Sequence, residues 1–316
     1  DLHSFPTRRS SDLDLNWIDN YLGYDPGAMY TDSTYYISTP QELIDFSMAV
    51  SGGATYSNAY LEADIDMEGY NSQFKPIGNS SKSFRGTFDG QGHRILNLHI
   101  TGGDFTGFFG AVGGGANISN FVFDSSCSIS GVNYVGLAGG SSGTGKVIFS
   151  YVGNEANVTG SGINAGGIIG CNKGSTCTFN IHDCYNTGNI IGSSESAAIS
   201  GWLGTNAVLQ NCYNIGTVEG YSYRNDFYRG GASALNCYSI ATTQVNRVSA
   251  EDVENGKLCY QLNSGKTLDP TWYQTIGQDA YPIFDNTHCV VLKGQDGTYY
   301  NITHLAGDVD GNDVLD

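Results

Sequence analysis

Short apolar runs of three to five residues recur through the middle of the chain, and Gly, Asn and Ser separate them. Runs of this length, bounded by turn-forming residues, predict β-strands rather than helices. From about residue 105 to 246 the runs form a repeat, in which a Gly-containing apolar segment opens each unit and an Asn- and Tyr-containing segment closes it. The opening segments are Phe105–Gly110, Tyr134–Gly139, Ala165–Gly170 and Ser200–Gly204, and the closing segments are Cys184–Gly188, Asn211–Val218 and Asn236–Ser239.

The repeat has a period of about 25 to 31 residues, which is typical of stacked units rather than of a conventional globule. The turns are too tight for crossover helices, so the pattern predicts a coil of parallel strands with neighbouring turns about 4.8 Å apart. Equivalent residues then stack. Cys184, Cys212 and Cys237 form one column, and Asn186 lies beside Asn214, where the amides form a ladder. A β-sandwich of Gly-rich hairpins is the alternative, although sandwiches rarely repeat Cys-Tyr-Asn at even spacing.

At these residues the chain resembles the GLUG-motif repeat proteins, which are bacterial secreted and surface proteins. Their motif pairs an opening segment like Gly166–Gly170 with a closing segment like Asn211–Val218. The resemblance extends over roughly residues 37–302, and its most specific part is the block from Phe74 to Ile100. It implies a mainly β protein with a right-handed parallel β-helix, and it implies little about activity.

A helix is predicted at the start of the β-helix. Thr39 is placed to cap it, Pro40 takes its first position, and Glu42 completes a capping box. Gly52-Gly53 ends the helix, which is expected to cover the open end of the core. The Tyr- and Asp-rich residues 14–37 before it are expected to be irregular.

A second cap is predicted after the repeats. Ser249 is expected to cap a short helix that ends at Asn263–Gly265. Apolar residues on both sides of Asp296-Gly297 predict a hairpin. The resemblance implies that this small helix and hairpin close the far end of the β-helix.

One stretch carries alternating carboxylates. Leu61–Met67 predicts a strand with its apolar residues, Ala63 included, pointing inward and with Glu62, Asp64 and Asp66 pointing outward. Three carboxylates on one face form a candidate calcium site, and a solvated acidic edge is the plainer alternative.

Charge narrows the classes of partner. The 316 residues include 31 acidic and 14 basic side chains, for a formal net charge of −17. This charge disfavours nucleic acids and anionic lipids, which both require a basic face. No apolar run is long enough to span a bilayer, so no transmembrane segment is predicted.

The chain contains eight cysteines, which would suggest disulfides in a secreted protein. Stacked Cβ atoms at the strand spacing lie farther apart than the ~3.8 Å of a disulfide, so buried free thiols are predicted in the column. The spacing of Cys171, Cys177 and Cys184 matches no zinc motif, and His182 beside them lacks a partner pair.

Residues 1–13 resemble the in-frame translation of a sequencing adapter and are expected to be foreign to the fold. No signal peptide is visible, and we expect the natural start, with any export signal, to lie outside this sequence. The predicted parts are this foreign segment, an N-terminal segment with the capping helix (14–53), the β-helix (54–246), the C-terminal cap (247–306) and a calcium-loop segment (307–316).

Parallel β-helices include polysaccharide lyases and glycoside hydrolases, so an enzyme is one alternative. A glycosidase requires two carboxylates across a groove, and a lyase requires clustered carboxylates with a base. Arg224 and Arg229 flank an aromatic run that is predicted to be a surface loop. The repeats contain six acidic residues: Asp124, Glu155, Asp183, Glu195, Glu219 and Asp226. No two of them are expected at equivalent positions of adjacent units, so no catalytic residue is predicted.

The sequence therefore favours a non-catalytic extracellular scaffold or adhesin-like module that binds a glycan or a protein at the cell surface. Its candidate ligand-binding residues are Tyr221, Tyr223, Arg224 and Tyr228. The alternative is a carbohydrate-active enzyme or the non-catalytic region of one. Acidic and basic side chains should converge in one groove of an enzyme, whereas in a scaffold they should scatter.

Residues 307–316 resemble the opening of a type I dockerin, which binds calcium and docks onto a cohesin. Asp308, Asp310 and Asn312 stand at positions 1, 3 and 5 of an EF-hand-like loop, and Val314 stands at position 7. Asp313 replaces the usual Gly, and the acidic ligand of position 12 is absent. Weak or no calcium binding is therefore expected of this chain, and an acidic tail that matches by chance is the alternative.

Overall fold

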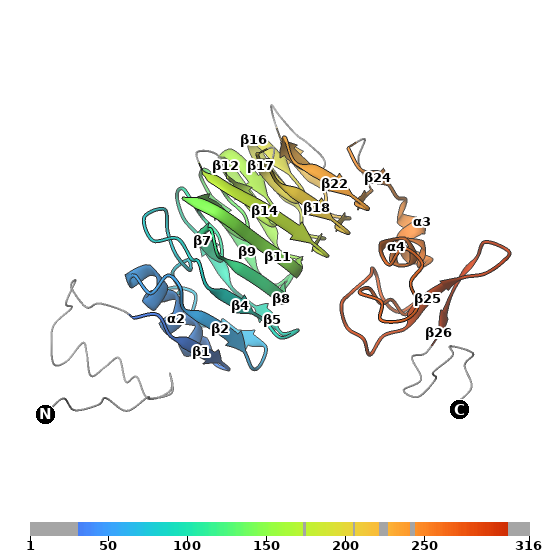
Figure 1. Ribbon diagram of the computed structural model, residues 1–316, viewed down its shortest axis with the longest axis horizontal. Coiled ribbons are helices and arrows are strands. Elements are labelled where there is room, and N and C mark those ends of the chain that lie inside the picture. The colour runs from blue at the N-terminus through green and yellow to red at the C-terminus, as the bar shows by residue number, and fades with distance from the viewer. Residues whose placement is uncertain (1–30, 173–174, 205, 221–226, 241–243, 303–316) are drawn as a thin grey trace, which may run out of the picture.

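The computed structural model describes residues 31–172, 175–204, 206–220, 227–240 and 244–302. These residues form a parallel β-solenoid of about six turns, followed by a smaller C-terminal lobe, residues 249–302 (Figure 1). The predicted parallel β-helix is confirmed, and the sandwich alternative is excluded because every strand pair of the solenoid is parallel.

Three sheets make up the solenoid among the described residues. The longest contains β1 (Thr34–Ile37), β2 (Asn58–Leu61), β3 (Ile65–Asp66), β4 (Thr87–Asp89), β5 (Arg94–Leu96), β8 (Asn117–Phe123), β11 (Thr144–Asn154), β14 (Thr176–His182), β15 (Tyr185–Asn186), β18 (Val208–Gln210), β19 (Tyr213–Asn214), β22 (Ser233–Leu235), β23 (Tyr238–Ser239) and β24 (Asn246–Arg247). The second contains β7 (Phe109–Gly113), β10 (Ala138–Ser142), β13 (Ile169–Cys171), β17 (Ser200–Leu203) and β21 (Tyr228–Gly230). The third contains β6 (His99–Thr101), β9 (Ser128–Gly131), β12 (Asn157–Gly166), β16 (Ile190–Ala197) and β20 (Val218–Gly220).

Within each turn, the chain passes through the second sheet, then the longest sheet, then the third sheet. The corners of the path hold non-glycine residues in the left-handed backbone conformation, which Asn and Asp adopt more readily than most residues. One corner column lies within the longest sheet, and a second lies between the third and second sheets. Their members are Asn120, Tyr151, Asp183, Asn211 and Asn236 in the first column, and Phe105, Tyr134, Asn164 and Glu195 in the second.

The predicted amide ladder is confirmed and is longer than expected. Asn154 donates from Nδ2 to Oδ1 of Asn186 at 2.8 Å, and Asn186 donates in the same way to Asn214 at 2.8 Å. Asn214 continues the ladder to Oγ of Ser239 at 3.3 Å. All four side chains are fully buried, so each amide satisfies a polar group that water cannot reach.

The cysteine column is confirmed too. Each of Cys184, Cys212 and Cys237 directly precedes a tyrosine, and these tyrosines pair with one another in parallel register. All three cysteines are buried, and the eight cysteines of the chain are free. Burial raises the pKa of Cys212 well above its ordinary value, so its thiol behaves as a small apolar group.

The predicted N-terminal helix is confirmed as α2 (Pro40–Gly52). Thr39 accepts from the backbone N–H of Glu42, the Glu42 carboxylate accepts from that of Thr39, and Gly53 ends the helix at φ 137°. Phe46 carries the helix onto the core through ring contacts with Phe84 and Phe88 at 5.9 and 6.2 Å. The segment before the helix is not wholly irregular, since β1 already pairs with β2 as the first strand of the solenoid.

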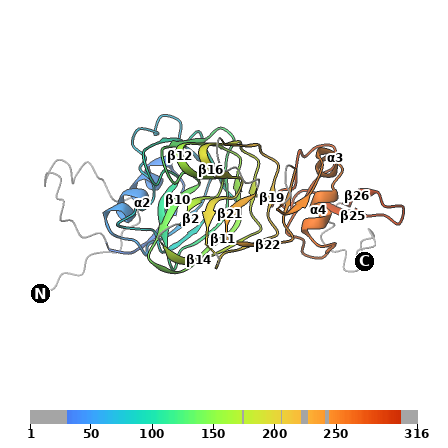
Figure 2. The same cartoon turned by 90° about the horizontal axis from the view of Figure 1, so that it is seen from above.

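The C-terminal lobe contains α3 (Ala250–Glu254), α4 (Lys257–Leu262) and the antiparallel hairpin β25 (Val290–Lys293) and β26 (Tyr299–Ile302). The hairpin is confirmed. The single helix predicted after Ser249 is two helices, because Gly256 turns the chain at φ 84° between them. The lobe does not close the far end of the solenoid, as the resemblance implied, but packs along its flank. Trp272 meets Tyr213 at 5.2 Å between ring centroids, and Tyr281 bonds to Glu155 of an earlier turn. Figure 2 shows the lobe beside β19 and β22. Within the described residues, no helix has the length and apolar character needed to cross a membrane.

Candidate functional site

A cleft with a volume of about 1090 Å³ lies between the solenoid and the C-terminal lobe. Four successive turns of the solenoid form one wall, which includes Asp89, Gln91, Arg94, Asn120, Tyr151 and Tyr185. Two loops of the lobe form the other wall, which includes Asp269, Tyr273, Phe284, Asp285 and His288.

The solenoid wall follows the corner column of the longest sheet. Asn120 and Tyr151 of this column, and Gln91 in the turn before Asn120, have positive φ values between 49° and 57°, so the chain bends sharply at each of them. The bend places successive side chains at the edge of the cleft. Nδ2 of Asn120 donates to Oδ1 of Asp89 at 2.9 Å, and this hydrogen bond holds both side chains in place in the wall.

Aromatic rings join the two walls. Phe284 of the lobe contacts Trp272 at 4.5 Å, Tyr185 at 5.5 Å and Tyr151 at 5.9 Å between ring centroids. Tyr151 and Phe284 are only half-buried, so parts of both rings face the cleft. Offset and edge-to-face contacts of this kind contribute about 0.5–1.5 kcal/mol each beyond the area they bury.

Gly153 explains how Tyr185 reaches this wall. It pairs with Tyr185 in the neighbouring turn. A Cβ atom at Gly153 would lie 2.3 Å from Cζ of Tyr185, so only glycine leaves the ring room to lie across the preceding turn. From there the Tyr185 hydroxyl donates to Oε1 of Glu155 at 2.8 Å.

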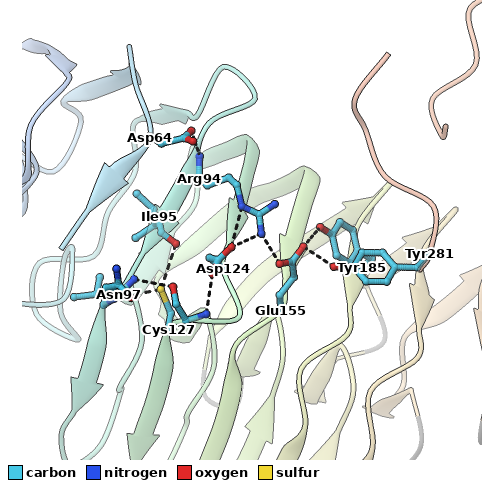
Figure 3. A network of polar contacts seen from close by, with 11 residues as sticks. Asp64, Arg94, Ile95, Asn97, Asp124, Cys127, Glu155, Tyr185 and Tyr281 are labelled. Atoms are coloured by element: carbon cyan, nitrogen blue, oxygen red, sulfur yellow. Dashed lines mark hydrogen bonds and ion pairs between the residues drawn. The ribbon is translucent and has the colours of Figure 1, made fainter. Parts of the chain in front are cut away.

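A polar network connects the base of the cleft to the lobe (Figure 3). The Arg94 guanidinium binds both Asp124 and Glu155, and its Nε lies 3.0 Å from Oδ2 of Asp124. Glu155 also accepts from the hydroxyls of Tyr185, at 2.8 Å, and Tyr281, at 3.0 Å. The Glu155 side chain is only 6% exposed, so the network holds a nearly buried carboxylate between the solenoid and the lobe.

The charges of this network stabilise one another. Burial disfavours the Arg94 cation, but Glu155 and Asp124 outweigh burial and raise the pKa of Arg94. Burial likewise opposes ionisation of Asp124, yet the backbone N–H of Ser126 and the guanidinium of Arg94 lower its pKa. Burial and the neighbouring Glu155 charge raise the pKa of Tyr185 and Tyr281, which keeps both hydroxyls protonated as donors.

The lobe wall carries a second set of charges. His288 contacts Oδ2 of Asp279 through Nδ1 at 2.7 Å, and its Nε2 lies 3.7 Å from Oδ2 of Asp285. Burial opposes ionisation of Asp285, but the backbone N–H and hydroxyl of Thr287 and the nearby His288 lower its pKa. The exposed carboxylates of Asp269 and Asp285 therefore give this wall an acidic surface.

The structure corrects the expectation about paired carboxylates. Asn154 pairs with Phe123, so the next residues, Glu155 and Asp124, occupy equivalent positions of adjacent turns. The sequence spacing did not reveal this pair because the turn between them carries no recognisable closing segment. Neither carboxylate is free, since both bind Arg94.

The predicted ligand-binding residues do not form this site. Tyr221, Tyr223 and Arg224 lie outside the described residues. Tyr228 lies on β21 of the second sheet, packs against the core, and is absent from the cleft lining. The structure also does not describe the four calcium-loop residues, Asp308, Asp310, Asn312 and Val314. The calcium loop therefore stays a prediction.

Arg229, which flanks the aromatic run predicted to be a surface loop, is largely buried. Its Nη1 lies 2.9 Å from Oε2 of Glu195, and its guanidinium lies 4.7 Å above the Trp202 ring. The side chain is 17% exposed. Arg229 therefore joins its turn to Trp202 of the second sheet and to Glu195 of the third sheet.

The acidic stretch Leu61–Met67 is not one strand. β2 ends at Leu61 and β3 begins at Ile65, so Glu62 and Asp64 lie between the strands while Asp66 lies on β3, and Ala63 is only half-buried. Asp64 accepts from the backbone N–H of Arg94 at 2.9 Å, and Asp66 accepts from Asn97 at 2.8 Å. Across the residues that the structure describes, no group of three or more His, Cys, Asp or Glu is arranged to hold a metal ion.

Comparisons with known proteins place the fold but not the activity. No family model matches the chain. Halomucin of Haloquadratum walsbyi is 34% identical over 162 residues, which is 45% of this chain and 2% of halomucin, so the chain spans a very small part of that protein. A crystal structure of a candidate immunoglobulin A1 protease from Bacteroides ovatus superposes with a TM-score of 0.57 and 20% identity, over 80% of this chain and 92% of that one. This likeness shows the fold alone.

Proposed function

We propose that the protein is an extracellular, non-catalytic β-solenoid module that binds a neutral glycan in the cleft between the solenoid and the C-terminal lobe. The observation that carries the proposal is the composition of the cleft walls, where the half-buried rings of Tyr151 and Phe284 lie in the same cleft as several hydrogen-bonding side chains. Concave sites with apolar walls and a few fixed polar groups are typical of small-ligand binding.

A sugar ring matches these walls. Its C–H face packs on aromatic rings such as Tyr151 and Phe284, while its hydroxyls bond to amides and carboxylates such as those of Gln91 and Asp89. Tyrosine is suited to this task because it offers a large rigid surface with little loss of conformational entropy on binding.

The charge of the cleft favours a neutral ligand. Asp89, Asp269 and Asp285 contribute carboxylates to its lining, whereas Arg94 is already paired with Asp124 and Glu155. The chain as a whole carries a net charge of −17. Uronate, sulfate or sialate groups would therefore meet like charge on entering the cleft.

A carbohydrate-active enzyme is the second candidate, because Asp124 and Glu155 stand side by side next to the cleft. A glycoside hydrolase needs one carboxyl that protonates the leaving group and a second that is nucleophile or base. Glu155 is nearly buried and holds Arg94 and two tyrosine hydroxyls instead. This arrangement suits a structural link, and it leaves no accessible acid in the pair.

An extracellular or surface location is supported by the partial likeness to halomucin. We also propose, on the sequence resemblance alone, that residues 307–316 belong to a calcium-dependent cohesin attachment in a bacterial protein. A cohesin pull-down of the natural full-length protein in calcium and in chelator tests this part. Retention that does not depend on calcium, or no retention, would exclude it.

Calorimetric titration with neutral and acidic oligosaccharides tests the glycan site. Wild-type protein should bind a neutral xylo-, manno- or cello-oligosaccharide and should not bind oligogalacturonate. Tyr151→Asn removes the ring while keeping a residue that tolerates the left-handed corner, and it should weaken binding about tenfold.

Tyr134→Asn is the matched control, because Tyr134 has the same backbone conformation, φ 58°, in the other corner column. It should leave binding unchanged. Binding of oligogalacturonate as tightly as of neutral sugars would contradict the charge argument. Binding of a surface protein without any glycan would favour the protein-binding alternative, and release of reducing ends would favour the enzyme.

A further inference from the structure

Two tyrosines stack on the outer surface of the first two turns. The rings of Tyr36 and Tyr60 lie 5.7 Å apart between centroids with an angle of 24° between their planes. Tyr36 is 56% exposed, and Tyr60 is half-buried. Their inward neighbours, Tyr35 and Ala59, are buried, so the pair lies on the outward face and takes no part in the core.

The strand register connects this pair to the cleft. Tyr36 pairs with Tyr60, and Tyr60 pairs with Asp89, which lines the cleft. The three side chains therefore stand in one outward column, and Tyr36 lies two turns, or roughly 10 Å, from Asp89.

Gln91 closes the gap between the column and the cleft. Its backbone N–H donates to Oδ1 of Asp89 at 2.9 Å, and its side-chain amide donates to the carbonyl of Leu61 at 2.8 Å. Leu61 directly follows Tyr60. A cleft-lining amide thus lies against the turn that carries the tyrosine pair.

We infer that the glycan site continues from the cleft onto the tyrosine pair, so that its ligand is an extended neutral chain rather than a terminal sugar. The cleft spans four turns of the solenoid, and the pair adds the two turns before them. This surface runs along the solenoid axis. It has the tyrosine pair at one end, the polar side chains of Asp89 and Asn120 in the middle, and the Tyr151 ring beyond them. This inference rests on the proposed function, because it extends the same site.

The test compares chain lengths. Affinities of the full chain for xylo-, manno- and cello-oligosaccharides of two and of six sugars are measured by titration calorimetry. Wild type should bind the six-sugar form of its preferred series at least about tenfold more tightly than the two-sugar form, because only the longer chain reaches the second aromatic surface. Tyr36→Ala with Tyr60→Ala should remove that gain and leave the two-sugar affinity unchanged.

Tyr56→Ala is the matched control. Tyr56 is 57% exposed on the same turns, but it precedes Asn58 at the opposite end of β2, away from Asp89. It should keep the length dependence. Equal affinities for both lengths, or a double variant that retains the gain, would overturn the inference while leaving the proposed function standing. Failure of every oligosaccharide to bind would overturn both.

Discussion

Replacing Glu155 by Gln should loosen the lobe from the solenoid. The carboxylate is 6% exposed and accepts hydrogen bonds from Arg94, Tyr185 and Tyr281. A Gln amide keeps one oxygen for the tyrosines but turns an N–H donor toward the Arg94 donors. The substitution thus converts charge-assisted bonds into neutral ones and leaves one contact repulsive.

The magnitude follows from these contacts. Hydrogen bonds to charged groups contribute about 1.5–3 kcal/mol each, and breaking a buried ion pair costs about 3–5 kcal/mol. Arg94 keeps its bond to Asp124, and its side chain is 34% exposed, so water can compensate part of the loss. We therefore expect a decrease of about 2–3 kcal/mol in the free energy of unfolding.

Urea unfolding measures this decrease. Far-UV circular dichroism follows the sheets, and tryptophan emission includes Trp272 at the lobe interface. The urea midpoint should fall by about 1 M, given the slope expected for a chain of this size. Glu219→Gln is the control, because Glu219 is exposed on β20 and the substitution is identical. The reasoning would be refuted if both variants stayed within about 0.5 kcal/mol of wild type, the range of ordinary surface substitutions.

Three further predictions concern the solenoid. Asn186→Ala interrupts the amide ladder at a fully buried position and should cost about 2–4 kcal/mol, because Asn154, Asn214 and the Gly188 carbonyl each lose a bond. Urea unfolding beside the exposed control Asn206→Ala checks this. Burial raises the pKa of Cys212 and Cys259, so the buried thiols should resist alkylation at pH 8 until denaturant is added. Peptide mass spectrometry should show that Cys289 is modified first, because it is the one cysteine that is only half-buried. Folding lowers the pKa of Asp124, so its contribution to stability is present above the unfolded-state pKa of about 3.9 and is lost as the pH falls through the lower folded-state pKa. The urea midpoint should therefore drop more steeply below about pH 4 in wild type than in Asp124→Asn, and parallel curves would contradict the lowered pKa of Asp124.

The repeat and its stacked cysteine and asparagine columns were predictable because short motifs in the local sequence determine them. Cys-Tyr-Asn occurs in two successive turns and Cys-Tyr-Ser in the next, and stacking then follows from strand geometry without knowledge of any distant contact. The capping box of α2 was predictable for the same reason, since Thr39 and Glu42 lie three residues apart. Asn154 was missed because its turn reads Gly-Asn-Glu where the later turns read Tyr-Asn.

The cleft was not predictable because its two walls come from segments far apart in the chain. No local pattern shows that Tyr281 meets Glu155 or that Phe284 meets Tyr151. One signal was present in retrospect. Gly153 stands where the next turns place Tyr185 and Tyr213, and a glycine in a strand often marks a close approach by another group.

The placement of the lobe also bears on the order in which the chain folds. Ladder contacts join residues 25 to 32 positions apart, so each turn can form on the one before it as soon as it is available. The lobe contacts that complete the cleft join residues 69 and 126 positions apart, and they require several finished turns as a template. During synthesis from the N-terminus, the solenoid can therefore assemble progressively, and the cleft between the solenoid and the lobe forms last.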